Sequence, residues 1–160
     1  MRTIATSFSL ALTALLLLPA LARAQAKPLA SVETNWPGVT IDLASVERKA
    51  SVLTVKWTVR NGAAEAKAVH FGLKGRSVTT YLVDEESGTK YYALTDKEGN
   101  LVASESEYLG SDTYGIQENV PAGESRRYWI KFPAPPVAVK TLTVFFSNAE
   151  PLEEVPITEK

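Results

Sequence analysis

The chain has 160 residues, of which 22% are charged, and its formal net charge is −1 at pH 7. This balance provides no basic stripe for phosphate groups, so nucleic-acid binding is not expected. The length suits one domain with its own hydrophobic core, and because the sequence contains no cysteine, packing rather than disulfides must stabilise it.

The first 26 residues have the pattern of a secretory signal peptide. Arg2 provides an early positive charge, an apolar stretch follows over residues 9–22, and Ala24-Gln25-Ala26 supplies small residues for cleavage. The apolar stretch is shorter than the about 20 residues that a membrane-spanning helix needs. We expect cleavage after Ala26, with cleavage after Ala24 as the alternative. The mature chain is then a periplasmic or secreted bacterial protein that does not span the membrane.

Residues 27–38 are expected to form a flexible leader that ends in a turn at residues 35–38. A β-sandwich domain is expected over residues 39–160. Its first strand begins at residue 39, where apolar and polar residues alternate. The clearest strand covers residues 51–61, because Leu53, Val55, Trp57 and Val59 fall on one face and polar residues on the other.

Short strands and turns continue to the end of the chain. Residues 63–76 allow either a helical turn or a loop followed by a strand at residues 68–73. About eight or nine strands, with turn signals roughly every ten residues and no long helical period, predict an all-β antiparallel β-sandwich. The later strands are expected within residues 77–84, 89–96, 101–106, 126–132, 139–147 and 152–158.

Two clusters of acidic residues are candidates for a metal or small-ligand site. Each follows an apolar run and precedes or contains a glycine, so both are interpreted as hairpin turns. A calcium-binding EF-hand counted from Asp96 lacks the required glycine at its sixth position. The alternative is a calcium or small-ligand site built across converging loops. Its residues would be Asp84, Glu85, Asp96 and Glu98.

Few residues support catalysis. A zinc site or a serine triad would depend on His70, the one histidine, and no G-x-S-x-G motif presents a serine. We interpret His70 as a partly buried structural residue. Glu105 and Glu107 share one face of an expected strand and could act as a glycosidase pair, but acidic residues on a solvent-facing edge commonly keep a sheet soluble. We expect no enzymatic activity and no cofactor.

Residues 126–132 offer a candidate binding surface. Alternation places Tyr128, Ile130 and Phe132 on the core face and turns the intervening residues outward. An outward tryptophan between two cations is typical of a small recognition patch. In the plainer interpretation the alkyl stems of the cations cover the indole. The candidate binding residues are Trp129, Arg127 and Lys131.

Several segments together resemble a family. The strand VKWTVRN, the hairpin YLVDEESGTKYYAL with Asp84, Gly88 and Tyr91, the segment PAGESRRYWIKFPAPP and the closing VKTLTVFF are similar to bacterial secreted immunoglobulin-like domains of unknown function. These domains are related in architecture to a small mycobacterial secreted immunogenic protein. The resemblance covers about residues 39–157.

The resemblance implies an immunoglobulin-like sandwich that serves adhesion, scaffolding or partner binding, and it brings no catalytic residues. We therefore expect a non-catalytic exported envelope protein with a binding or scaffolding module. Its expected partner is another envelope protein or a cell-wall component. The alternative is a calcium- or small-ligand-binding protein that uses the acidic loops.

Overall fold

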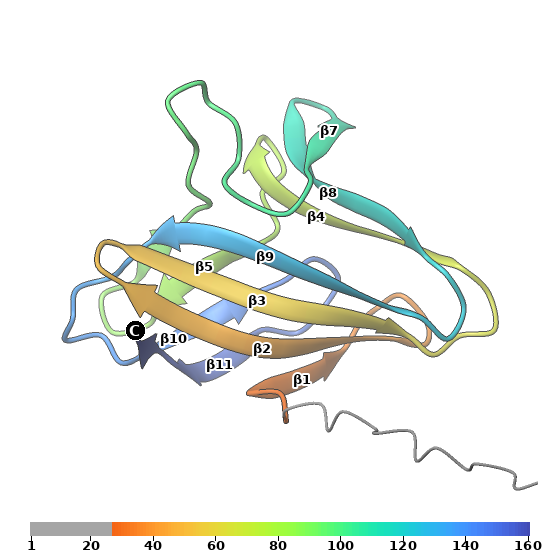
Figure 1. Cartoon of the computed structure of the whole chain (residues 1–160), viewed down its shortest axis with the longest axis horizontal. Helices are drawn as coiled ribbons and strands as arrows, with labels where there is room; N and C mark the ends of the chain where they lie inside the picture. Colours follow the sequence, from red (N-terminus) through yellow and green to blue (C-terminus); the bar gives the residue numbers. More distant parts are fainter. Residues whose placement is uncertain (1–26) are drawn as a thin grey trace, which may run out of the picture.

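The computed structural model describes residues 27–160, and the expected signal peptide lies outside the described residues (Figure 1). Within this part of the chain all regular structure is β-strand, and no helix is long and apolar enough to cross a membrane. The all-β class is thereby confirmed. The strands are β1 (Ala30–Glu33), β2 (Val39–Lys49), β3 (Val52–Asn61), β4 (Lys67–Gly75), β5 (Tyr81–Asp84), β6 (Thr89–Tyr91), β7 (Glu107–Gly110), β8 (Thr113–Val120), β9 (Ser125–Pro133), β10 (Thr141–Phe145), β11 (Leu152–Pro156) and β12 (Thr158–Glu159).

These strands form three sheets. The largest has the order β1-β2-β3-β9, with β12 also pairing with β2. A four-stranded sheet has the order β11-β10-β5-β6, and a three-stranded sheet has the order β4-β8-β7. Every pairing between these strands is antiparallel except that of β12 with β2. The five-stranded sheet forms one layer, and the two smaller sheets lie across the core from it (Figure 1).

Trp57 lies where the three sheets meet. Its side chain is fully buried, and its ring lies 5.3 Å from Phe71 of β4, 5.5 Å from Tyr128 of β9 and 5.2 Å from Phe146 just after β10. The alternation predicted for residues 51–61 is confirmed, because the apolar face of β3 is buried against this cluster. Burial of such large aromatic groups is the main stabilising contribution available to a chain without disulfides.

The expected flexible leader is wrong for residues 30–33. These residues form β1, which pairs with β2 from Ala30 opposite Leu43 to Glu33 opposite Thr40. Ala30 and Val32 pack against the core, and the outer edge of β2 supplies the hydrogen-bonding partners that an isolated segment would lack. The turn expected at residues 35–38 is present, with Gly38 at a φ of 79°.

One further segment settles an alternative that the sequence left open, and two others differ from the predicted strands. Residues 63–76 form a loop followed by a strand, β4, rather than a helical turn. The strand expected at residues 89–96 ends at Tyr91, and residues 101–106 form only isolated bridges. The segment 94–104 instead covers the edge of β9, because Ser104 N donates to Trp129 O at 2.8 Å and Lys131 N donates to Val102 O at 2.9 Å.

Strands β8 and β9 follow each other in sequence but do not pair. A turn over residues 121–124 joins them, after which β8 pairs with β4 and β9 pairs with β3 (Figure 1). Asn61, at the end of β3, is buried beneath this turn and donates through Nδ2 to the carbonyl of Val120 at 2.8 Å. The two strands therefore diverge from a fixed point into different sheets.

Candidate functional site

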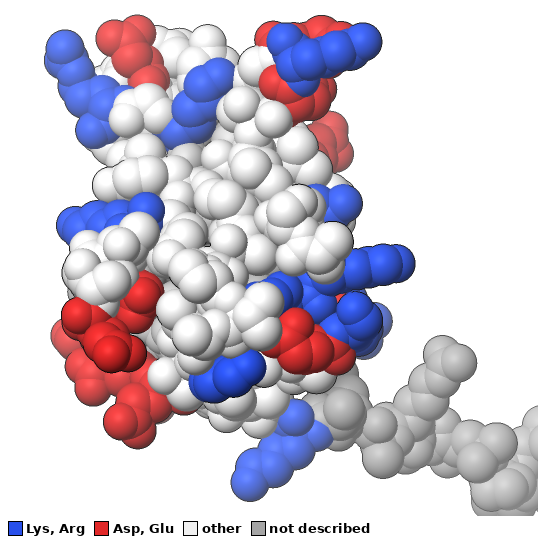
Figure 2. All heavy atoms as spheres, turned by 90° about the vertical axis from the view of Figure 1, so that its left-hand side faces the viewer, with Lys and Arg blue, Asp and Glu red and all other residues white. Residues whose placement is uncertain are grey.

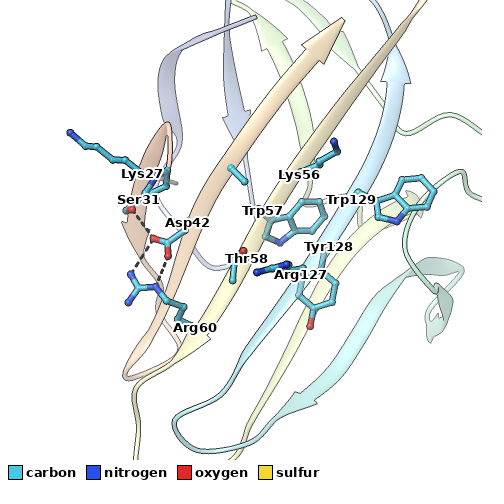
Figure 3. A pocket seen from close by; sticks show the side chains of 12 residues that line it. Lys27, Ser31, Asp42, Lys56, Trp57, Thr58, Arg60, Arg127, Tyr128 and Trp129 are labelled. Carbon is cyan, nitrogen blue, oxygen red and sulfur yellow. Dashed lines mark hydrogen bonds and ion pairs between the residues drawn. The ribbon is translucent and has the colours of Figure 1, made fainter. Parts of the chain in front are cut away.

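The outer face of the five-stranded sheet carries a groove of about 700 Å³ (Figure 3). A bulge in β2 at Ala44 places a small side chain in its wall, where the register shifts between Leu43 and Ser45. Larger polar side chains of β1, β2, β3 and β9 surround that position. The groove is lined by Lys27, Pro28, Ser31, Asp42, Ala44, Lys56, Trp57, Thr58, Arg60, Arg127, Tyr128 and Trp129.

Trp129 forms one end of this groove. The predicted alternation of β9 is confirmed, since Tyr128, Ile130 and Phe132 are buried whereas the Trp129 residue is 38% exposed. Its backbone is held on both sides of the strand, by pairing with Lys56 of β3 and by the 2.8 Å hydrogen bond from Trp129 N to Ser104 Oγ. The backbone that carries this exposed indole is therefore already fixed, and such preorganisation lowers the entropic cost of binding in general.

The other two predicted binding residues have different positions. Arg127 is exposed and lines the groove, but Lys131 is half-buried and lies outside its lining. The cation–π pairs among residues 27–160 join Lys74 to Tyr114 and Lys90 to Tyr81, and none involves Trp129. The exposure of Trp129 shows that the neighbouring cations cover its indole incompletely.

Asp42 sets the electrostatics of the groove floor. Its carboxylate accepts hydrogen bonds from Ser31 Oγ at 2.7 Å, from Arg60 Nη2 at 3.1 Å and from Arg60 Nε (Figure 3). The hydrogen bond from Arg60 is the main reason why the pKa of Asp42 lies below its usual value, against the opposing effect of burial. Asp42 and Arg60 thus neutralise each other.

The remaining cations leave the groove net positive. Lys56 pairs with Glu47 at 3.0 Å, outside the groove lining. Within the described part of the chain, Arg127 has no ion-pair partner. An unpaired guanidinium beside an exposed indole is suited to carboxylates and other planar anions.

Sequence patterns had placed Lys56 and Arg60 on the outer face of their strand without assigning them to a site. Their position beside Trp129 follows from the register in which β3 pairs with β9. That register follows from matching the two buried faces, but the contributions of Ser31 and Lys27 depend on β1, where the sequence predicts a flexible leader.

Two of the four acidic residues proposed for a metal site, Asp84 and Asp96, act as turn caps. The carboxylate of Asp84, a residue that is 7% exposed, accepts from Ser87 Oγ at 2.6 Å and from Glu86 N at 3.2 Å. Asp96 accepts from Asn100 N at 2.8 Å and from Glu98 N at 3.0 Å. Bonds from the Asn100 side chain and backbone are the main causes that lower the pKa of Asp96. Both segments are therefore turns, as predicted.

The four candidate ligands are not assembled into one site. Asp84 and Glu85 line a pocket that also contains Glu153 and Glu154, whereas Asp96 and Glu98 do not line it. Among residues 27–160 no group of three or more histidine, cysteine, aspartate or glutamate residues could hold a metal ion. In Figure 2 acidic side chains gather at the lower left of the view, and acidic and basic side chains lie together at its upper right. The calcium alternative therefore lacks a ligand set in this structure.

The two catalytic candidates also differ from expectation. His70 is exposed rather than partly buried, and its ring lies edge-on to Trp36 with centroids 5.5 Å apart. The strand expected through Glu105 and Glu107 is wrong for Glu105, since β7 begins at Glu107. Both glutamates are exposed, and they line a cleft between β8 and β9 together with Glu118.

Comparisons of this chain with protein-family models, with curated proteins and with solved structures found no match. The resemblance to secreted immunoglobulin-like domains therefore stays a prediction, and the functional argument rests on the geometry of the groove.

Proposed function

We propose that this protein is a non-catalytic binding module of the bacterial envelope, built on an immunoglobulin-like β-sandwich and exported by the signal peptide expected over residues 1–26. One observation carries the proposal. The groove on the five-stranded sheet ends at an exposed Trp129 and contains an Arg127 without an ion-pair partner among the described residues. Tryptophan and arginine are the residue types that most often dominate the binding energy of an interface.

The chemistry of the groove favours an acidic partner. A carboxylate can form two parallel hydrogen bonds with Arg127, while an apolar or aromatic group next to it covers the indole of Trp129. The salt bridges of Asp42 and Lys56 already satisfy those side chains. We assign the groove to an acidic segment of another envelope protein, with an anionic cell-wall polymer as the second candidate of the same charge.

The test uses purified residues 27–160 and a glutamate-rich peptide that contains one aromatic residue, with binding measured by calorimetry. Trp129→Ala should weaken binding by about thirtyfold, as expected for a central aromatic contact. The matched control is Tyr92→Ala, which removes an aromatic residue that is 50% exposed outside the groove. For the charge, Arg127→Ala is compared with Lys97→Ala, a lysine whose side chain is 89% exposed and whose ion pair joins it to Glu98.

Two results would count against the proposal. Equal affinity of wild type and Trp129→Ala would remove the groove as the binding surface. Saturable turnover of any substrate class by the purified protein would contradict the non-catalytic assignment. Purified cell wall tested with the same four variants distinguishes the polymer from the protein partner.

A further inference from the structure

We propose that the cleft between β8 and β9 receives an extended basic segment of a partner protein, which adds to the fold as a β-strand. This site lies beside the groove described above but has a different chemistry. It offers backbone hydrogen bonds and carboxylates, whereas the groove offers an indole and cations. Arg127 lines both, because its strand separates them.

The cleft exists because β8 and β9 separate after their connecting turn. Strand β8 pairs with β4 and strand β9 pairs with β3, which belong to different sheets, and residues of both β8 and β9 line one cleft. Residues 104–107 cross from the edge of β9 to the start of β7 and form a third wall. The lining comprises Ser104, Glu105, Ser106, Glu107, Ile116, Gln117, Glu118, Arg127 and Tyr128.

The edge of β9 is covered only in part. Segment 94–104 takes the backbone groups of Lys131 and Trp129, and this cover ends at Ser104. In an antiparallel ladder alternate residues direct their N–H and C=O groups to the same side. Arg127, two residues before Trp129, therefore directs both groups to the outer side, where no described backbone group bonds to them. An exposed donor and acceptor of this kind are the template for strand addition.

The edge of β8 is covered in a complementary way. Strand β7 pairs with β8 only over Thr113–Gly115, and the partner register ends there. From Ile116 onward no strand of residues 27–160 lies on that side, and Asn61 Nδ2 donates to the carbonyl of Val120 near the turn. The open parts of both edges thus lie between the covering segments and the turn.

The size of the cleft fits a short piece of strand. Its volume is about 550 Å³. A residue in a packed sheet occupies about 160 Å³, from a rise of about 3.3 Å, a strand spacing of about 4.8 Å and a sheet spacing of about 10 Å. The cleft therefore holds about three extended residues, which is the length of the part of β8 that lines it, residues 116–118.

Three carboxylates and one guanidinium, that of Arg127, line the cleft, so its charges favour a basic segment. Glu118 is already satisfied, since Arg126 Nε lies 2.6 Å from one carboxylate oxygen and Tyr128 OH lies 2.8 Å from the other. Glu105 and Glu107 have no ion-pair partner within the described residues. Lysine or arginine at alternate positions of an added strand would face one side together and could meet these two carboxylates.

The test measures amide hydrogen exchange by NMR on residues 27–160, with three seven-residue peptides as probes. The first alternates lysine and valine. The second alternates glutamate and valine, and the third has the lysine–valine sequence with N-methylated backbone amides. We expect the first peptide at saturation to slow exchange of the Arg127 amide at least tenfold and to shift signals of residues 116–118 and 125–127. The second and third should do neither, because one has the wrong charge and the other cannot donate backbone hydrogen bonds.

Variants test the charge selection. Glu105→Gln combined with Glu107→Gln should weaken binding of the basic peptide about three- to tenfold, the range expected for two exposed ion pairs. Glu85→Gln combined with Glu86→Gln is the matched control, since these two exposed glutamates lie in another turn, and it should leave the affinity unchanged.

Three outcomes would overturn the proposal. Equal binding of the N-methylated peptide would exclude strand addition, and protection confined to other residues would exclude the cleft. Protection of Arg127 without peptide that disappears on dilution would assign the cleft to a second copy of this chain. None of these outcomes bears on the groove, whose test uses an acidic peptide and Trp129.

Discussion

Substitution of Asn61 tests how the turn between β8 and β9 is fixed to the end of β3. Asn61 is 1% exposed, and its side chain joins three parts of the chain. Nδ2 donates to the carbonyls of Glu65 and Val120, each at 2.8 Å, and Oδ1 accepts from Ala63 N at 2.9 Å. Replacement of Asn61 by alanine removes these three bonds and a longer fourth one, from Nδ2 to Pro121 O at 3.2 Å, while leaving its own backbone bonds to Gly123 and Glu124 in place.

The expected cost follows from these contacts. Each well-formed hydrogen bond contributes about 1 kcal/mol net, and a buried carbonyl left without a partner adds to the loss. Asn61→Ala should therefore lower the free energy of unfolding by about 3 kcal/mol, which corresponds to a fall of about 10 °C in Tm for a domain of this size.

Urea unfolding at pH 7 measures this change, and the slope with denaturant should stay the same if the native state is otherwise intact. Asn119→Ala is the control, because Asn119 is exposed and its side chain has no hydrogen bond to the described residues; it should cost less than about 0.5 kcal/mol. A loss below about 1 kcal/mol for Asn61→Ala would refute the reasoning.

Other substitutions test separate features. Hydrogen bonds, first of all from Lys160, lower the pKa of Glu47 from 4.5 to about 2, so its ionised form stabilises the fold above pH 4.5 and this contribution is lost as the pH falls towards 2. Urea unfolding should show that Glu47→Gln costs about 1 kcal/mol at pH 7 and less near pH 2; an equal cost at both would contradict this. Gly75→Ala should cost about 3 kcal/mol, because its Cβ would lie 1.8 Å from Asp112 O. Gly88→Ala, with no atom within 4 Å of its Cβ but a φ of 68°, should cost about 1 kcal/mol in the same assay. Arg48→Met removes a buried guanidinium that donates to Glu159 at 2.7 Å and Val139 O at 2.8 Å, and should cost about 2 kcal/mol. It should also speed exchange of the Lys160 amide, which donates to Arg48 O; unchanged exchange would show that the Arg48 side chain does not hold β12 against β2.

Strand periodicity predicted β2, β3 and β9 because each has one face in the core and one in solvent. It missed β8, where glycine interrupts the alternation. Gly115 is required there for a reason invisible in one sequence, since a Cβ at this position would lie 1.9 Å from the carbonyl oxygen of Phe71. Periodicity also missed β1, because four residues are too few to show a clear alternation. These residues are a strand because they form hydrogen bonds with the exposed edge of β2.

The sequence predicts the orientation of single residues of the candidate site but not how they assemble into a groove. Alternation alone turns Trp129 outward, but the groove depends on the register that places Lys56 opposite it and on the bulge in β2. The cleft was beyond sequence reasoning, because a turn signal such as that of residues 121–124 ordinarily predicts two paired strands. The sheet that a strand joins is decided by burial across the whole core. Trp57 of β3 contacts Tyr128 of β9 in its own sheet and Phe71 of β4 in another sheet.

The two ends of the described chain share the outer edge of β2. Strand β1 pairs antiparallel with its first half and β12 pairs parallel with its second half, from Thr158 opposite Glu47. The partners of Ala30 and Glu159, Leu43 and Arg48, are five residues apart along β2, so the two ends lie about 17 Å apart along the strand. A short linker could therefore join Lys160 to Lys27, and a circularly permuted chain opened at the turn that contains Gly88 would lose only the covalent connection between the paired strands β5 and β6. In that permuted protein β1 and β12 would no longer be terminal strands. The new linker would join them along the outer edge of β2.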